Sequence, residues 1–180
     1  ASPVQGVAPL SVELTLVGNV PVTQVTLDQD GDGDIDFQGP ALEGVRFTYA
    51  QPGVYLALAT ATTPGGLQHA TVAVQAYDRP ALESLLQARW TAMKNALRQG
   101  DVEGALLFIT GTARDRYRAA FQAIAADLPQ IDSVLGAITY VRAWGPEVVF
   151  QMPRTDGGVD KSFEVRFAAD DDGVWRLRAF

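Results

Sequence analysis

The hydrophobic pattern of the chain changes its period between Tyr77 and Pro80, and this change limits the folds open to it. Before it, apolar and polar residues alternate in short segments separated by Gly, Pro and Asn, as in "LSVELTLVG". Beyond it, apolar residues recur at intervals of three and four. A period of two is typical of strands with one buried face, and a period of 3.6 of amphipathic helices. The sequence therefore predicts two domains, residues 1–78 and 79–180, joined with almost no linker.

The first domain is predicted to be an all-β antiparallel sandwich. Its strand-like segments are residues 10–18, 22–28, 44–50, 53–61 and 67–77. No segment of helical period lies between them, and their spacing is that of a sandwich.

The second domain begins with a predicted helix. One face of this helix carries Leu82, Leu86, Trp90, Met93 and Leu97. Pro80 stands near its first turn, and Gly100 is placed to end it. Asp101 is predicted to cap a second, short helix, and Thr112 with Asp115 to form a capping box for a third. The buried stripe of the third helix is predicted to be Tyr117, Phe121, Ile124 and Leu128.

Four predicted strands complete the second domain, over residues 137–144, 147–153, 162–169 and 174–180. Hairpin turns are predicted at "TDGG" and "DDDG", and Asp170, Asp171 and Asp172 form the solvated tip of the second turn. Helices followed by an antiparallel meander indicate an α+β domain.

Charge is distributed unevenly between the two domains. Residues 1–78 contain eight acidic residues and one basic residue, Arg46, so they carry the whole net charge of −7. A nucleic-acid partner is not expected, because its binding needs clustered Lys and Arg. Membrane insertion is not expected either, since no apolar run approaches the ~20 residues that span a bilayer. The absence of cysteine excludes disulfides and thiolate metal sites.

Five aspartates in nine residues, within "LDQDGDGDIDF", point to a cation site. Asp28, Asp30, Asp32, Gly33 and Asp36 match positions 1, 3, 5, 6 and 9 of an EF-hand-type calcium loop. Gly39 stands at position 12, where a bidentate Glu would close the site, so Asp34 or a backbone carbonyl would have to complete the shell. The predicted cofactor is a structural calcium ion held by a loop between strands. The alternative is a polar hairpin without metal, in which the Asp-Gly pairs serve the turn.

Residues 2–78 also resemble a known family. The blocks "GVAPLSVEL", "LDQDGDGDID", "FTYAQPGVYLALATAT" and "ATVAVQAYD" are similar in order and spacing to the PKD family of immunoglobulin-like β-sandwich modules. The resemblance implies a seven-stranded extracellular domain of the kind found in surface proteins and as an accessory module of secreted hydrolases.

Residues 80–180 resemble, more weakly, the NTF2-like (cystatin-like) α+β fold, in which N-terminal helices pack on a curved four-stranded antiparallel sheet. The motif that carries this resemblance is the final "DDDGVWRLRAF". It implies a cone that can enclose an apolar pocket. The aromatic residues that are candidates to line such a pocket, or to form an ordinary core, are Trp90, Tyr117, Tyr140, Trp144, Phe150, Phe163 and Phe167.

No catalytic constellation is recognisable beside these aromatics. The one histidine, His69, lies on a predicted strand of the first domain, and Asp127, Asp132 and Glu147 are isolated candidate bases. We therefore expect a non-catalytic extracellular, cell-surface or periplasmic module of a bacterial protein that binds a protein or glycan partner. The alternatives are a small-molecule-binding or enzymatic cone carried on a PKD spacer, and a purely mechanical spacer.

Overall fold

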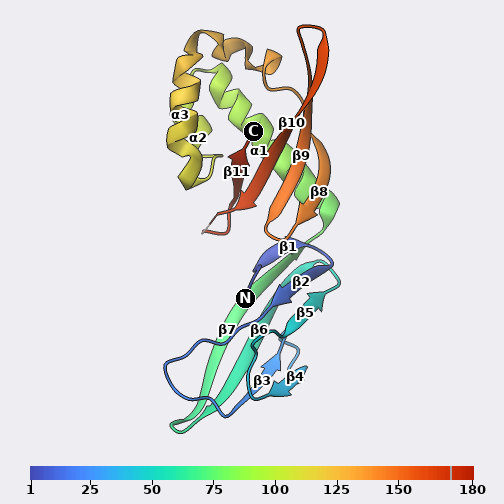
Figure 1. Cartoon of the computed structure of the whole chain (residues 1–180), viewed down its shortest axis with the longest axis vertical. Coiled ribbons are helices and arrows are strands. Elements are labelled where there is room, and N and C mark those ends of the chain that lie inside the picture. The colour runs from blue at the N-terminus through green and yellow to red at the C-terminus, as the bar shows by residue number, and fades with distance from the viewer. Residues whose placement is uncertain (171) are drawn as a thin grey trace. The chain divides into compact units, whose positions relative to one another are not determined.

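The structure is a computed structural model that describes residues 1–170 and 172–180. The chain divides into two compact units, unit 1 (Ala1–Arg79) and unit 2 (Pro80–Phe180). Strands are the main element of the molecule, and they form separate sheets in the two units (Figure 1).

Unit 1 contains seven strands in two sheets. The five-stranded sheet has the order β1-β7-β6-β3-β4, and the other sheet pairs β2 with β5. The strands are β1 (Gln5–Val7), β2 (Leu10–Glu13), β3 (Gln24–Asp28), β4 (Phe37–Gly39), β5 (Arg46–Tyr49), β6 (Gly53–Thr63) and β7 (Gly66–Tyr77). All neighbouring pairs are antiparallel except β1 and β7.

The two sheets of unit 1 share one hydrophobic core. Val12 and Tyr49 of the two-stranded sheet and Val25, Leu27 and Val74 of the five-stranded sheet belong to the same buried cluster. Along β6 the small residues of the core face alternate with exposed residues, which is the pattern of a strand with one buried face.

The five predicted strands of the first domain are all present, with corrected limits. Residues 10–18 do not form one long strand, because pairing of β2 with β5 ends at the Glu13–Arg46 pair. The short strands β1 and β4 were not predicted. Three residues are too few to show a period, and β1 pairs with β7, which lies some 70 residues away in sequence.

Unit 2 starts with helix α1 (Arg79–Arg98), which buries the predicted stripe from Leu82 to Leu97. Gly100 follows it with a φ of +74°, a left-handed conformation that glycine adopts at little cost. Helix α2 (Val102–Leu106) is capped by Asp101, whose carboxylate accepts a hydrogen bond from the Gly104 N–H at 2.8 Å. The predicted first helix and the Asp101 cap are thus confirmed.

The predicted third helix is shorter than expected, and its capping box is wrong. Thr112 lies inside the 3₁₀ helix η1 (Gly111–Ala113), so it cannot occupy the cap position of α3 (Arg114–Ala123). After Ala123 the chain forms the 3₁₀ segment η2 (Ala125–Ser133), which contains Pro129. Proline lacks an N–H and clashes with the carbonyl four residues earlier, so an α-helix cannot continue through it.

The four predicted strands of unit 2 form an antiparallel sheet in the order β11-β10-β9-β8. They are β8 (Thr139–Trp144), β9 (Glu147–Asp156), β10 (Val159–Ala169) and β11 (Trp175–Ala179). Phe150 and Phe167 are fully buried, and the Trp90 ring of α1 lies 5.2 Å from that of Phe180, the residue after β11. Asp171, part of the predicted hairpin tip, lies outside the described residues, whereas Asp170 and Asp172 form ion pairs with Arg176.

Candidate functional site

The aspartate-rich segment is the loop from β3 to β4. Asp28 is the last residue of β3, and Asp36 immediately precedes β4. The Asp36 N–H donates a hydrogen bond to the carbonyl of Leu27 at 2.9 Å, which brings the two ends of the loop together. Gly31 and Gly33 have φ values of +83° and +96°, a region that other residues seldom adopt.

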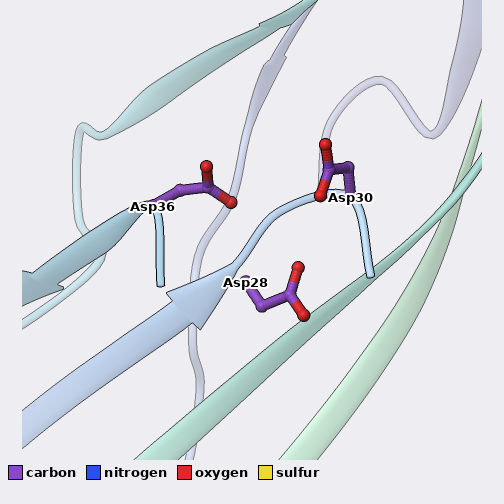
Figure 2. A group of neighbouring side chains, drawn as sticks. All are labelled: Asp28, Asp30 and Asp36. Carbon is purple, nitrogen blue, oxygen red and sulfur yellow. The ribbon is translucent and has the colours of Figure 1, made fainter. Parts of the chain in front are cut away.

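Three of the five aspartates form a cluster. One carboxylate oxygen from each of Asp28, Asp30 and Asp36 lies within 4.8 Å of the others. Figure 2 shows these side chains at the end of the β3 arrow and on the loop that follows it. Asp32 and Asp34, also predicted to be ligands, are not in this group.

Backbone N–H groups hold all three carboxylates of the cluster in place, and the Asp30 Oδ1 atom accepts its bond from the Asp32 N–H at 3.3 Å. The Asp28 oxygens accept hydrogen bonds from the Gly31 N–H at 2.6 Å and the Gly33 N–H at 2.9 Å. The Asp36 Oδ2 atom accepts one from the Gln29 N–H at 2.7 Å. These bonds order the loop, and they leave acceptor positions on the same oxygens for a further partner.

Asp32 lies outside the cluster but makes the same kind of turn bond as Asp30. Its Oδ1 atom accepts a hydrogen bond from the Asp34 N–H at 2.8 Å, which is the side-chain-to-backbone pattern of an Asx turn. This carboxylate therefore serves the turn, as in the metal-free interpretation of the hairpin. The EF-hand spacing, by contrast, places Asp32 among the ligands. The sequence spacing of the aspartates does not show whether Asp32 is a cation ligand or a turn residue, because either role depends on how the loop folds.

The electrostatics of the loop reflect its concentrated negative charge. Partial burial raises the pKa of Asp28, but the backbone hydrogen bonds from Gly31 and Gly33 outweigh it, so the net shift is downward. Burial, together with the charges of Asp30 and Asp36, raises the pKa of Tyr49 to about 12. Among the described residues, no salt bridge joins these carboxylates to a Lys or Arg.

The three carboxylates fit a hard divalent cation in type but supply only part of a coordination shell. Calcium takes six to eight oxygen ligands. Water and backbone carbonyls would have to provide the remainder. Gly39, at position 12 of the EF-hand spacing, is paired with Val25 within the sheet, so the loop does not close as an EF-hand does.

The predicted pocket residues of unit 2 occupy different environments. Trp90 and Phe150 are buried in the core, where the Trp90 Nε1–H donates to the Gly136 carbonyl at 2.8 Å. Tyr140 is half-buried and its ring packs edge-on against Phe150. Trp144 ends β8 beside the Gly145 turn, is 79% exposed, and is not among the residues that line the hollow described below.

An open hollow of about 240 Å³ does exist in unit 2, at a position that the sequence only partly predicts. Tyr117 and Phe163 were candidates, and the other lining residues come from α3, η2 and the residues that flank η2, from β9, and from Phe180. The full set is Tyr117, Ala120, Phe121, Ile124, Ile131, Val134, Leu135, Met152, Arg154, Phe163 and Phe180. For Met152 and Arg154 the sequence did carry a signal. They alternate with Phe150 along β9, so their side chains are expected on the same face of the strand.

The lining of the hollow contains no Asp or Glu side chain. Its one charged group, Arg154, forms an ion pair with Asp156 at 3.2 Å and lies over the Phe163 ring. The candidate bases lie elsewhere: Asp132 is paired with Lys94 and Arg98, Glu147 is paired with Arg178, and Asp127 is exposed. His69 lies on β7, where its Nδ1 atom is 3.0 Å from the Thr60 hydroxyl.

Within the described part of the chain, no helix has the length and apolar character needed to cross a membrane. Comparison of the chain with protein-family models, with curated proteins and with solved structures finds no match.

Proposed function

We propose that this chain is a non-catalytic extracellular, cell-surface or periplasmic module of a bacterial protein, and that calcium stabilises the β3–β4 loop of unit 1. In this proposal unit 1 is a PKD-like immunoglobulin sandwich and unit 2 an NTF2-like α+β domain. The module binds a protein or glycan, or separates other parts of a longer protein.

The observation that carries the proposal is the cluster of Asp28, Asp30 and Asp36. Three carboxylate oxygens within 4.8 Å repel one another unless a cation lies near them. Among the described residues no basic side chain is paired with them. Oxygen ligands alone, from carboxylates on a short loop, favour calcium or magnesium over softer metals.

Calcium is expected to raise the melting temperature of unit 1. A cation that binds the folded loop and not the unfolded chain contributes RT ln(1 + [Ca²⁺]/Kd), or about 1.4 kcal/mol at ~1 mM calcium and a Kd of ~10⁻⁴ M. For a unit of this size the rise is roughly 6–11 °C. The measurement is a thermal melt of the full chain in EGTA and in millimolar calcium, with magnesium as a second condition.

Two substitutions that each remove one negative charge test whether the calcium response depends on the cluster or on the loop as a whole. Asp30→Asn removes a clustered ligand and is expected to abolish the calcium response, while it relieves repulsion and raises the melting temperature in EGTA. Asp34→Asn removes the same charge outside the cluster and is expected to keep the response. A wild-type shift below about 1 °C, or equal loss of response in both variants, contradicts the proposed site.

One observation favours the alternative of a small-molecule-binding domain. The hollow of about 240 Å³ in unit 2 is lined almost wholly by apolar side chains, as ligand sites are, although it is smaller than most of them. Titration with small apolar probes, followed through the amide spectra of α3 and η2 residues, tests this alternative. Perturbations confined to the lining residues would support it.

A further inference from the structure

The outer edge of β7 is unpaired over most of its length. On one side β7 pairs with β6 without a register shift, from Thr63↔Gly66 to Gly53↔Ala76. On the other side β1 pairs with only the last three residues, Gln75 to Tyr77. The stretch from Gly66 to Val74 therefore has a neighbouring strand on one side alone.

The hydrogen bonds at the paired end show which backbone groups point outward. The Gln75 N–H donates to the Val4 carbonyl at 2.9 Å, and the Tyr77 carbonyl accepts from the Ala8 N–H at 3.0 Å. Because backbone groups alternate sides along a strand, those of Leu67, His69, Thr71 and Ala73 also point to this edge. Among the described residues, the N–H and C=O groups of these four residues have no backbone partner on that side.

Free strand edges invite pairing with another chain, and proteins commonly protect them with charges, prolines, bulges or covering segments. Several other edges in the described chain have such protection. Strand β8 has a register shift beside the charged Arg142, and β11 is covered where Leu177 exchanges hydrogen bonds with Phe108 and Thr110. The seven residues from Leu67 to Ala73, "LQHATVA", contain no acidic residue, Lys, Arg, Pro or bulge.

The core of unit 1 is also incomplete beside this edge. A slot of about 90 Å³ reaches β7 at Ala70, Thr71 and Val72, and its lining continues along the sheet to β6 and β3. The remaining lining residues are Ala1, Leu14, Thr15, Leu16, Leu27, Leu42, Ala57 and Ala59. A strand added to β7 would place every second side chain on the face of the sheet that carries this slot.

We propose that the free edge of β7 pairs with the same edge of a second copy of the chain, in an antiparallel two-fold arrangement centred on Ala70. In this register Leu67 lies opposite the partner's Ala73, and His69 opposite the partner's Thr71. The outward backbone groups of all four residues then gain partners. A second copy fits this edge because Leu67–Ala73 carries no Asp, Glu, Lys or Arg, so two copies of the strand meet without like charges at the seam, and the two-fold register pairs each outward residue with another outward residue.

The acidic loop does not prevent this pairing. β3, which leads into the loop, is separated from β7 by β6. In a continuous sheet the two copies of β3 are five strand spacings apart, or roughly 24 Å, which is about three Debye lengths at physiological salt. An edge contact alone buries less than a stable interface of ~1,000 Å², so the dimer is expected to be weak, with a Kd on the order of 10⁻⁴ M.

The test is sedimentation of the full chain between about 10 µM and 1 mM, which spans the expected Kd. Wild type is expected to shift from monomer to dimer across this range. Thr71→Pro removes an N–H that points away from β6, so the β6–β7 ladder remains while the dimer loses two hydrogen bonds. Thr71→Lys places two like charges at the seam. Each substitution is expected to weaken dimerisation about tenfold or more.

Thr48→Lys is the matched control, because Thr48 is exposed on β5, which belongs to the other sheet of unit 1. It adds the same charge to unit 1 and is expected to leave dimerisation unchanged, and circular dichroism checks that all three variants are folded. A wild type that remains monomeric at about 1 mM overturns the proposal, as does a dimer that both Thr71 variants form as well as wild type does.

Discussion

Replacing Phe150 with alanine is expected to lower the free energy of unfolding of unit 2 by about 3–5 kcal/mol. The Phe150 side chain is fully buried, and its ring packs edge-on against Tyr140 and Phe167 at centroid distances of 5.9 and 5.5 Å. Truncation removes these contacts and leaves a cavity that rigid strands on both sides of β9 cannot fill. The total loss of stability is the free energy of transferring the ring out of water plus the cost of the lost contacts and of the cavity.

Trp144→Ala is the control for this substitution. Trp144 belongs to the adjacent strand and is larger, but 79% of it is exposed, so its truncation is expected to change stability by less than about 0.5 kcal/mol. Urea unfolding of the full chain, followed by far-UV circular dichroism, compares the two variants. Similar losses for both would contradict this prediction and show that Trp144 is buried in solution.

Asp132→Asn is expected to produce the second largest loss of stability. Lys94 is only 8% exposed, and its ammonium group contacts the Asp132 carboxylate at 2.8 Å and the Leu135 carbonyl at 3.0 Å. Removing the carboxylate charge leaves a buried cation with only neutral acceptors, the amide oxygen of the new Asn and the Leu135 carbonyl. Breaking a fully buried pair costs ~3–5 kcal/mol, and because the Asp132 side chain is 48% exposed we expect about 1–3 kcal/mol.

Lys94→Met is the informative comparison. It removes the cation and keeps an apolar chain of similar length in the buried position, while Asp132 retains its ion pair with Arg98. We therefore expect a smaller loss than for Asp132→Asn, measured by urea unfolding at pH 7. If Lys94→Met is the more destabilising change, the ion pair itself, and not the avoidance of an unpaired buried charge, stabilises this part of unit 2.

The effect of Asp132 should depend on pH in a defined direction. Hydrogen bonds from Arg98 and then from Lys94 hold the pKa of Asp132 well below its usual value. A carboxylate with a lowered folded pKa stabilises the protein above its unfolded pKa of ~3.9, and this contribution is lost as pH falls toward the folded value. The difference between wild type and Asp132→Asn should thus be complete at pH 7 and should shrink below about pH 4.

Local features of the chain were predictable from the sequence alone. Period, caps and turn residues act over a few neighbouring positions, so the α1 stripe, the Asp101 cap and the four strands of unit 2 could be inferred directly. The third helix was overextended for a local reason as well. Pro129 marks the segment in which an α-helix cannot continue, but the apolar spacing from Tyr117 to Leu128 suggested one long stripe.

Features that depend on the three-dimensional path of the backbone were decided by the tertiary structure. The spacing of the aspartates predicted five ligands, whereas the positive φ angles at Gly31 and Gly33 and the closure of Asp36 onto Leu27 bring only Asp28, Asp30 and Asp36 together. Likewise, the sequence cannot distinguish the buried Phe150 from the exposed Trp144, since both are aromatic residues in predicted strands. Burial depends on which strand lies at the sheet edge and what covers it, and those contacts join residues far apart in the chain.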